Sequence, residues 1–314
     1  MPGYQGARSR ATGGSYKTGA LVRIVRSNAA HTRPRYVIRQ SVSVEEEAST
    51  VLRTEGDVKR AELASGRSVG RVVVESPWEL KSTWEHRLWV GSASALMLTT
   101  FGLGLSTAQS ISDYGAIGVG AVGAYLLADL GTGIYHWAVD NYGDGSTPVF
   151  GGQIAAFQGH HRRPWTITER EFCNNVHKVF APATPVAAAL CLGSCFSPGT
   201  WSIWSSTFLF LACMSQQFHA WSHMKRSELP LAVSIAQDAG LLISRKDHGA
   251  HHKAPFDGNY CIVSGIWNPI LDMNGDQNSF FRVLERFIHS AWNVEPRCWH
   301  DPVDDWAEEV RSET

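Results

Sequence analysis

The sequence predicts an all-α integral membrane protein, with about four transmembrane helices, further interfacial helices, and a histidine-rich site for two metal ions on one membrane face. Two observations lead to this prediction. The middle of the chain contains long apolar runs between polar ends, although the mean hydropathy of the whole chain is only −0.15. Nine of the 13 histidines lie in that middle part, between His136 and His252.

The N-terminal region carries only positive charge. Residues 1–44 contain eight Lys or Arg and no Asp or Glu, with Ser, Thr, Gly and Ala between them and no apolar core. This composition is typical of an organelle transit peptide, and a disordered basic tail is the alternative. We expect residues 45–77 to form a polar linker, residues 78–300 the membrane domain, and residues 301–314 a C-terminal tail.

Four apolar runs are long enough to cross a bilayer as helices, because about 20 helical residues span a hydrocarbon core about 30 Å thick. They lie at residues 88–107, 114–139, 179–196 and 201–218. In the second run, small residues recur every fourth position and would let a neighbouring helix approach closely; they are Ala116, Gly120, Ala124 and Ala128. A fifth run, 229–244, is short and interrupted by Gln237 and Asp238, so we expect it to be interfacial or re-entrant.

The charges of the connections predict the orientation of the runs. The connection before 114–139 and the one before 201–218 contain no Lys or Arg, whereas nine Lys or Arg follow the second and fourth runs, between residues 162 and 253. In membrane proteins, the loops on the cytoplasmic side carry such an excess of basic residues. The asymmetry therefore favours four crossings with both termini on the basic side. A soluble helical protein with these runs in its core is the alternative.

Four crossings place all nine histidines on the basic side of the membrane. They are His136, His160, His161, His177, His219, His223, His248, His251 and His252. Their spacing groups them further, because residues three or four apart share one face of a helix. The pair at 219 and 223 has this spacing, as do the three at 248, 251 and 252, and as does His136 with Asp140.

Histidine is a common ligand of iron, zinc, copper and nickel, and imidazole is neutral near pH 7. Nine imidazoles exceed the three or four ligands of one zinc site and suit two metals. His177 stands alone in the sequence, without a second histidine one turn away. Asp140 and Asp129 are further candidates, either as ligands or as groups that support ligands, and a helix-packing hydrogen bond is the alternative for Asp129. We expect His31, His86, His289 and His300 not to be ligands.

Several other kinds of site are disfavoured. The chain contains no Glu-x-x-His and no His-Glu-x-x-His, the patterns of carboxylate di-iron bundles and of zinc proteases. None of the six cysteines forms a Cys-x-x-Cys pair. Residues 118–123 match Gly-x-Gly-x-x-Gly but lie within an apolar run, where glycines serve helix packing. A net charge of −1 gives no general attraction to nucleic acid.

The segment 279–291 is amphipathic, with Phe280, Phe281, Leu284, Phe287 and Ile288 interleaved with charged residues. Three placements fit this pattern equally. The segment would lie on the membrane surface, close the metal site, or pack in the core.

Four motifs resemble those of the plastid fatty acid desaturase 4 family. They are Phe-Gln-Gly-His-His-Arg-Arg-Pro-Trp-Thr-Ile-Thr from residue 157 followed by Asn-Asn-Val-His from 174, Gln-Gln-Phe-His-Ala-Trp-Ser-His from 216, Asp-His-Gly-Ala-His-His-Lys-Ala-Pro-Phe from 247, and Asn-Tyr-Cys-Ile-Val-Ser-Gly from 259. The resemblance covers about residues 78–300, which would therefore be the lipid desaturase domain. The wider group includes plasmanylethanolamine desaturases, which share His136-Trp-x-x-Asp140 and the His-His pair. Gly249-Ala250 departs from the bulkier residues that we expect in some members, at a place that bears on fine specificity.

The resemblance implies a specific reaction and cofactor. Plant members of the family place a trans double bond at carbon 3 of a palmitoyl chain on phosphatidylglycerol, in plastid membranes. Two non-haem iron ions, held by the nine histidines, would use O₂ and electrons from ferredoxin. The protein would lie in a chloroplast membrane, thylakoid or envelope, with its histidine face toward the stroma. The alternatives are a plasmanylethanolamine desaturase, which forms a vinyl ether on another membrane lipid, and a membrane metal-binding protein without catalysis.

A double bond at carbon 3 lies close to the ester, so the lipid headgroup would bind beside the metals. Basic residues near the histidines are candidates for the lipid phosphate; they are Arg162, Arg163, Arg245 and Lys246. Charges that only set the membrane topology are the alternative for these four residues.

Overall fold

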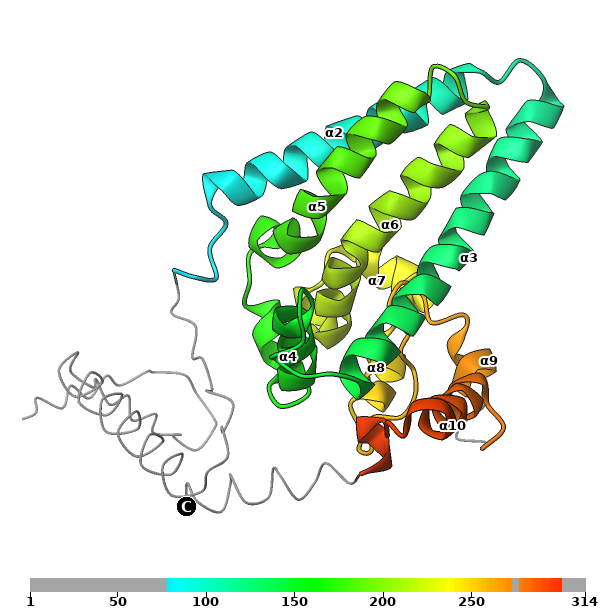
Figure 1. The fold of residues 1–314 in the computed structure, drawn as a ribbon. Coiled ribbons are helices and arrows are strands. Elements are labelled where there is room, and N and C mark those ends of the chain that lie inside the picture. The colour runs from blue at the N-terminus through cyan, green and yellow to red at the C-terminus, as the bar shows by residue number, and fades with distance from the viewer. Residues whose placement is uncertain (1–77, 273–276, 301–314) are drawn as a thin grey trace, which may run out of the picture. The chain divides into compact units, whose positions relative to one another are not determined.

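The computed structural model describes residues 78–272 and 277–300, and within these ranges every regular element is a helix. Four long helices lie side by side in a bundle (Figure 1): α2 (Trp84–Ser106), α3 (Ile111–Asn141), α5 (Phe172–Gly193) and α6 (Gly199–His223). The predicted transit peptide, linker and C-terminal tail lie outside the described residues.

Short helices connect and extend the bundle. The α-helices are α4 (Gly151–His160), α7 (Leu231–Asp238), α8 (Arg245–His251), α9 (Asn268–Asp272) and α10 (Phe280–Trp292). The 3₁₀ turns are η1 (Pro164–Thr168), η2 (Arg226–Glu228) and η4 (Arg297–Trp299).

Helices α2 and α3 each begin with polar capping residues, just before the apolar run from which the helix was predicted. The Thr83 hydroxyl accepts a hydrogen bond from the backbone N–H of His86, and the His86 ring accepts one from the backbone N–H of Thr83. Ser110 and Asp113 make the same reciprocal pair at the start of α3. Each pair satisfies two backbone donors that a helix start leaves open.

Helix α6 packs against α2, α3 and α5 and is the innermost helix of the bundle. Small residues allow the close approach: a Cβ added to Gly104 of α2 would lie 2.8 Å from the carbonyl oxygen of Gly199, and one added to Gly120 of α3 would lie 3.1 Å from the Thr200 side chain. The predicted small-residue stripe on α3 is therefore confirmed as a packing surface at Gly120, Ala124 and Ala128, which are buried, whereas Ala116, near the start of the helix, is exposed.

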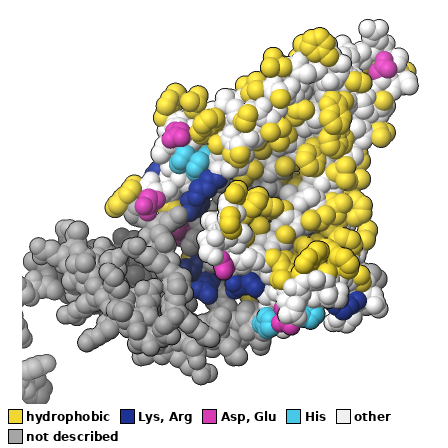
Figure 2. All heavy atoms as spheres, viewed as in Figure 1, with side chains coloured by type: hydrophobic (Ala, Val, Ile, Leu, Met, Phe, Trp, Pro, Cys, Tyr) yellow, Lys and Arg dark blue, Asp and Glu magenta, His cyan; other side chains and the backbone are white. Residues whose placement is uncertain are grey.

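Helices α2, α3 and α5 are long and apolar enough to cross a membrane. Helix α6 has 25 residues, which is long enough to cross, but it is more polar than the other three long helices because it contains serines such as Ser202 and Ser206. These serines are buried against neighbouring helices. The fourth crossing stays a prediction. Helix α7 has eight residues, a length of about 12 Å, so the fifth run is too short to cross as a helix. Figure 2 shows apolar side chains along the bundle.

The order of the helices determines where the histidines lie. The α2–α3 and α5–α6 hairpins both turn at one end of the bundle, so α3 and α6 end together at the opposite end (Figure 1). Helices α4, α8 and α10 gather at that opposite end. The Gly-x-Gly-x-x-Gly match at 118–123 lies inside α3 and follows no strand among the described residues, so it is not a dinucleotide fingerprint.

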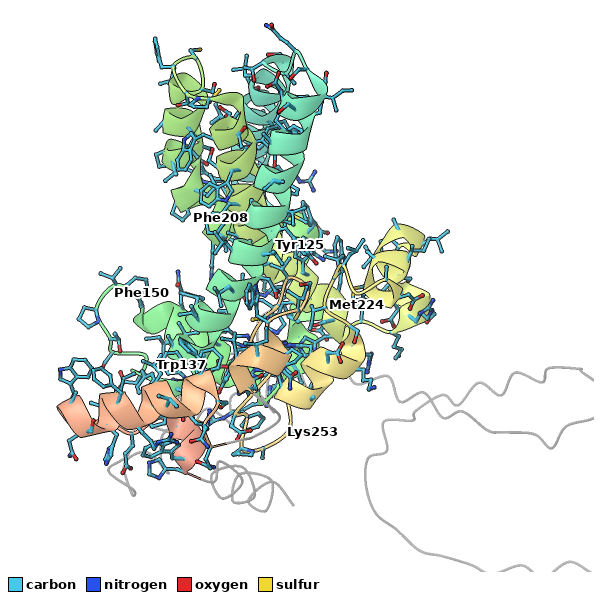
Figure 3. The ribbon with its side chains drawn as sticks, turned by 90° about the vertical axis from the view of Figure 1, so that its right-hand side faces the viewer. Tyr125, Trp137, Phe150, Phe208, Met224 and Lys253 are labelled. Carbon is cyan, nitrogen blue, oxygen red and sulfur yellow. The ribbon has the colours of Figure 1, made fainter. Side chains whose placement is uncertain are left out.

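Helix α10 packs at the end of α3 through its buried face. The Phe281 ring stacks on Trp137, with 5.1 Å between ring centroids, and contacts Tyr260 edge-on. Figure 3 shows Trp137 beside this helix. The opposite face, with Phe280, Val283 and Phe287, is about half exposed. Of the three predicted placements, core packing is thus confirmed for one face of α10.

Candidate metal centre

Two clusters of possible metal ligands lie next to each other at the end of the bundle. In each cluster, one ligand atom per residue lies within 4.8 Å of all the others. Cluster A consists of His160, His219, His223, His248 and His252. Cluster B consists of His136, Asp140, His161 and His251. The structure therefore brings together eight of the nine predicted histidines, together with Asp140.

Neighbouring histidines belong to different clusters. His160 ends α4 and belongs to cluster A, whereas the next residue, His161, belongs to cluster B. His248 on α8 and His252, directly after that helix, belong to cluster A, whereas His251 on α8 belongs to cluster B. Each of these two short segments thus supplies ligands to both clusters.

The ring nitrogens in cluster A have the spacing of ligands to one ion. The His223 Nε2 lies 3.0 Å from His160 Nε2 and 2.9 Å from His248 Nε2, which itself lies 3.1 Å from His252 Nε2. Two nitrogens bound at right angles to one ion, each at about 2.1 Å, lie about 3 Å apart. The nitrogen positions therefore fit a shared metal ion.

Hydrogen bonding alone does not satisfy cluster A. A neutral imidazole has one N–H donor and one acceptor nitrogen, so the His223 Nε2 cannot serve two ring nitrogens well. Both ring nitrogens of His219 are buried and lack a hydrogen-bond partner among the described residues. Burial, followed by repulsion from neighbouring histidines, holds the pKa values of His160, His248 and His252 well below the usual value. A bound cation would satisfy these lone pairs without protonating the rings.

Cluster B has its tautomers fixed by backbone carbonyls. His136 Nδ1 lies 2.9 Å from the Tyr260 carbonyl oxygen, and His251 Nδ1 lies 2.8 Å from that of Gly258. A carbonyl only accepts, so each Nδ1 carries the proton and each Nε2 presents a lone pair. These two Nε2 atoms lie 3.2 and 3.3 Å from the Asp140 carboxylate oxygen Oδ2.

Lone pairs that face a carboxylate oxygen repel it unless a cation lies between them. His161 Nε2 approaches the same carboxylate oxygen at 3.4 Å and the His251 Nε2 at 3.0 Å. Burial, followed by repulsion from the neighbouring His136, lowers the pKa of His251 to about 4. The donor set of three imidazoles and one carboxylate therefore fits a divalent transition metal.

The carbonyls that orient cluster B come from residues 258–265, which run along α3. Asp129 holds this segment, because its Oδ1 accepts backbone N–H bonds from Val263, Ser264 and Gly265 at 2.7 to 3.1 Å. Asp129 belongs to neither cluster. Of the roles predicted for Asp129, this geometry matches that of a group that supports metal ligands, here by holding the backbone segment whose carbonyls orient them.

His177 lies in neither cluster. Its ring stacks on His86 with 3.7 Å between centroids, and its Nδ1 lies 2.7 Å from the carbonyl oxygen of Asn174 on its own helix. The pair joins the start of α2 to the start of α5. The histidines expected not to be ligands, His86, His289 and His300, also lie outside both clusters, and His31 lies outside the described residues.

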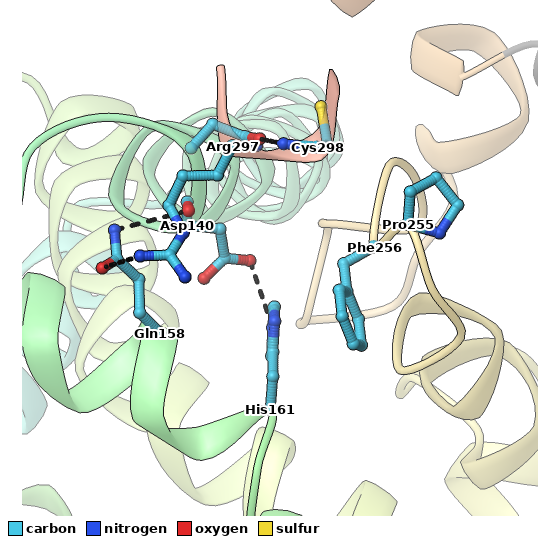
Figure 4. Close-up of a pocket in the computed structure, with 8 residues that line it drawn as sticks. Asp140, Gln158, His161, Pro255, Phe256, Arg297 and Cys298 are labelled. Atoms are coloured by element: carbon cyan, nitrogen blue, oxygen red, sulfur yellow. Dashed lines mark hydrogen bonds and ion pairs between the residues drawn. The ribbon is translucent and has the colours of Figure 1, made fainter. Parts of the chain in front are cut away.

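A polar pocket opens beside cluster B (Figure 4). Its lining residues are Asp140, Asn141, Gln158, His161, Pro255, Phe256, Arg297 and Cys298. The Gln158 amide donates to the carbonyls of Val139 and Gly143 at 3.2 Å, and its oxygen accepts from the Arg297 guanidinium at 2.8 Å. These bonds fix the Arg297 guanidinium at the pocket, next to a cluster B carboxylate.

None of the four predicted phosphate-binding residues lines this pocket. Arg245 donates to the His223 carbonyl oxygen at 3.1 Å, and Arg163 and Lys246 are exposed. Sequence reasoning missed Arg297, because it stands alone, far from any histidine motif. Arg297 is positioned by the 3₁₀ turn η4, and no pattern in the sequence predicts that turn.

A buried ion pair anchors α10 beside the site. Glu285 is fully buried and accepts hydrogen bonds from Arg282 at 2.6 Å, from the Trp137 indole at 3.0 Å and from the Trp299 indole at 2.9 Å. Trp137 directly follows the cluster B ligand His136. The ion pair thus connects α10 and η4 to the end of α3.

Comparison with known proteins identifies the family of this site. The family model of the lipid desaturase domain matches residues 125–299, a range that contains every residue of both clusters. The chain belongs to the lipid desaturase family. As a member it is an oxidoreductase that desaturates fatty acyl lipids, and its histidine clusters fit the metal site that such chemistry uses.

Among its relatives, the chain is 46% identical to fatty acid desaturase 4, chloroplastic, of Arabidopsis thaliana, over 73% of the chain and 69% of that protein. It is 42% identical to the fatty acid desaturase 4-like 1, chloroplastic, of the same plant, over 74% of the chain and 77% of the relative. Plasmanylethanolamine desaturase 1 of Mus musculus is 30% identical over 62% of the chain and 71% of that protein. No solved structure matches the chain.

Proposed function

We propose that this lipid desaturase introduces a trans double bond at carbon 3 of a palmitoyl chain on phosphatidylglycerol, with two iron ions and O₂. Two adjacent ligand clusters carry the proposal, because together they supply nine ligand atoms, more than one ion uses. The 46% identity to a fatty acid desaturase 4 supports the choice of substrate and bond.

The five histidines of cluster A would hold one iron ion, and cluster B, including Asp140, would hold the other. When bound, the iron pair supplies the reduction of O₂ that is coupled to the oxidation of an unactivated CH₂–CH₂ pair. The balance is one CH₂–CH₂ unit, O₂, two electrons and two protons, which give one CH=CH unit and two waters. An external donor therefore has to supply two electrons per double bond.

The chain's own residues bury the inner ligands of the clusters and orient them. His136, His219, His248 and His251 are at most 2% exposed. The carbonyls of Gly258 and Tyr260 hold two rings of cluster B in one tautomer and one orientation. Such preorganisation avoids a reorganisation cost during the reaction and excludes competing reactions with water.

The polar pocket supports a bond position near the ester. Asp140 and His161 belong both to cluster B and to the pocket lining. A headgroup phosphate held at Arg297 would place the first carbons of the acyl chain beside cluster B. Arg162, Arg163, Arg245 and Lys246 remain proposed contacts of the phosphate outside the pocket.

The relatives support a location in the chloroplast, and the proposed electron donor is chosen for that location. The two Arabidopsis relatives are chloroplastic, and residues 1–44 have transit-peptide composition. We place the protein in a chloroplast membrane, thylakoid or envelope, with the histidine end toward the stroma and ferredoxin as the donor. On the face that Figure 2 shows, Lys and Arg side chains lie toward the end of the bundle that carries the histidines, and loops rich in Lys and Arg stay on the side from which a membrane protein inserts, which here would be the stroma.

A lipid profile tests the proposed function. The chain is expressed in cells that contain palmitoyl phosphatidylglycerol and a reduced ferredoxin, and the lipids are analysed by mass spectrometry for double-bond position and geometry. We expect a new trans-3 palmitoyl species on phosphatidylglycerol. A new vinyl ether would instead favour the plasmanylethanolamine desaturase activity that the mouse relative carries in its name. Absence of any desaturated lipid, with iron bound, would favour a metal-binding protein without catalysis.

A further inference from the structure

One aromatic side chain lies against both metal-ligand clusters. The Phe157 ring meets the His136 ring of cluster B edge-on, with 5.2 Å between centroids, and lies 6.3 Å from the His219 ring of cluster A. Among the described residues, Phe157 is the one non-histidine ring that contacts histidines of both clusters. It therefore lies at the junction of the two clusters.

The outward side of Phe157 leads to the apolar surface of α3. The Tyr135 ring is 39% exposed and meets Phe157 edge-on, with 5.9 Å between centroids. Its hydroxyl donates to Gln153, which lies one turn before Phe157 on the same face of α4. Ile134, next to Tyr135, is also 39% exposed. Tyr135, Phe157 and His136 thus form a series of rings from the lipid-facing surface to cluster B.

The other rings at cluster B have different surroundings. Tyr260 is fully buried, and its hydroxyl donates to the Phe256 carbonyl oxygen and accepts from Asn141. Phe256 stacks on His161 at the polar pocket. Phe157 makes no such polar contact and is half-buried, so its ring can turn aside for an apolar chain.

We propose that Phe157 is a positioning residue that determines which CH₂–CH₂ pair of the acyl chain faces the two clusters. The inference rests on the proposed desaturase function and extends it to the choice of carbon. With the polar headgroup at the pocket that Asp140 and His161 line, and the chain held against Phe157 beside His136, the distance along the chain from ester to metal is fixed. Without the Phe157 ring, the acyl chain can shift along its length, so that neighbouring CH₂–CH₂ pairs also reach the metals.

The test compares Phe157→Ala and Phe157→Leu with the wild-type protein in the lipid-profile experiment, with iron measured in the purified proteins. A site that senses one methylene discriminates by about tenfold or more. We expect the share of product with the double bond at other carbons to rise about tenfold in Phe157→Ala and less in Phe157→Leu, while both keep the wild-type iron content. A purely structural role would not change the bond position.

Phe150→Ala is the matched control. Phe150, labelled in Figure 3, precedes the first turn of the same helix and is 51% exposed. We expect its product to match that of the wild type.

Unchanged bond position in both Phe157 variants would overturn the inference, and so would loss of iron from both. If Phe157→Ala does not accumulate, Phe157→Leu decides, because Leu keeps most of the apolar volume. Wild-type product in another lipid or at another carbon would refute the proposed function alone, since the comparison of positions still applies. A wild-type protein without any desaturated product would refute both.

Discussion

His251 and His177 differ in what surrounds their ring nitrogens, although both are histidines near the same end of the bundle. His251 has its Nδ1 proton bound by a carbonyl and its Nε2 aimed at Asp140, whereas His177 stacks on an exposed part of α2. The first arrangement prepares a lone pair for a metal, and the second joins two helices. Spacing in the sequence does not distinguish these two environments.

Replacing these two histidines should therefore have different effects on metal content. We expect His251→Ala to lower bound iron from about two to about one equivalent, because cluster B loses a ligand, and to abolish lipid desaturation. His177→Ala should keep both equivalents. Iron analysis of the purified proteins measures the difference. Equal iron loss in the two variants would restore His177 as a ligand and contradict the cluster assignment.

Glu285 should stabilise the folded protein through its buried ion pair with Arg282. Replacing it with Gln removes the 2.6 Å ion pair of the buried Arg282 guanidinium and leaves the Asp257 carboxylate, at 3.9 Å, as its nearest counter-charge. Loss of one partner of a buried ion pair costs about 3 kcal/mol or more. We expect Glu285→Gln to lower the Tm of the detergent-purified protein by roughly 6 °C or more.

Glu295→Gln is the control for this measurement, because Glu295 pairs with His300 on the surface with about half of its side chain exposed. An exposed pair contributes about 0–1 kcal/mol. Equal Tm values for the two variants would mean that the Glu285 ion pair is not a main support of α10.

At the scale of elements, the contact between α3 and the 258–265 segment controls cluster B. A Cβ added at Gly133 would overlap the Cys261 side chain and approach the Cys261 Cα at 3.4 Å. The Tyr260 and Gly258 carbonyls that orient His136 and His251 belong to this segment. Displacing the segment would therefore rotate two ligands.

We expect Gly133→Ala to weaken metal binding by about 10- to 100-fold, the usual effect of losing a partner that orients a ligand. Gly131→Ala is the matched control, since a Cβ at Gly131 meets nothing within 4 Å and alanine favours a helix over glycine by about 1 kcal/mol. Iron titration of the two variants measures the effect. Similar affinities would show that the segment shifts without moving the ligands.

The sequence predicted the elements better than their contacts. Runs of apolar residues and the i, i+4 histidine pairs located α3, α6 and α8, because those patterns depend on local helix geometry. The division of His160 from His161, and of His251 from His252, between two clusters was not predicted, because it depends on how α4 and α8 approach α6 and α3. The polar pocket likewise combines residues more than 100 positions apart in the sequence, such as Gln158 and Arg297.

At the scale of the whole molecule, the metal ligands connect parts of the chain that otherwise have few reasons to meet. Helices α3, α4, α6 and α8 all supply ligands at one end of the bundle, whereas the opposite end is held by the tight α2–α6 and α3–α6 contacts at glycines. At the end with the metal ligands, buried lone pairs repel each other unless a cation binds between them. The end with the α2–α3 and α5–α6 turns is held by helix packing and needs no cation. The two ends should therefore respond differently to metal removal.

Chelation followed by hydrogen–deuterium exchange tests this difference. Because metal binding contributes to folding where ligands come from several elements, we expect amide protection to fall in α4, α8 and the 258–265 segment after iron removal. Protection at the α2–α3 and α5–α6 hairpin ends should stay within error of the iron-loaded protein, and re-addition of Fe²⁺ should restore the rest. A uniform loss of protection along all four long helices would mean that the metals hold the entire bundle together. In that case the glycine contacts between α2, α3 and α6 would be insufficient to keep the bundle folded.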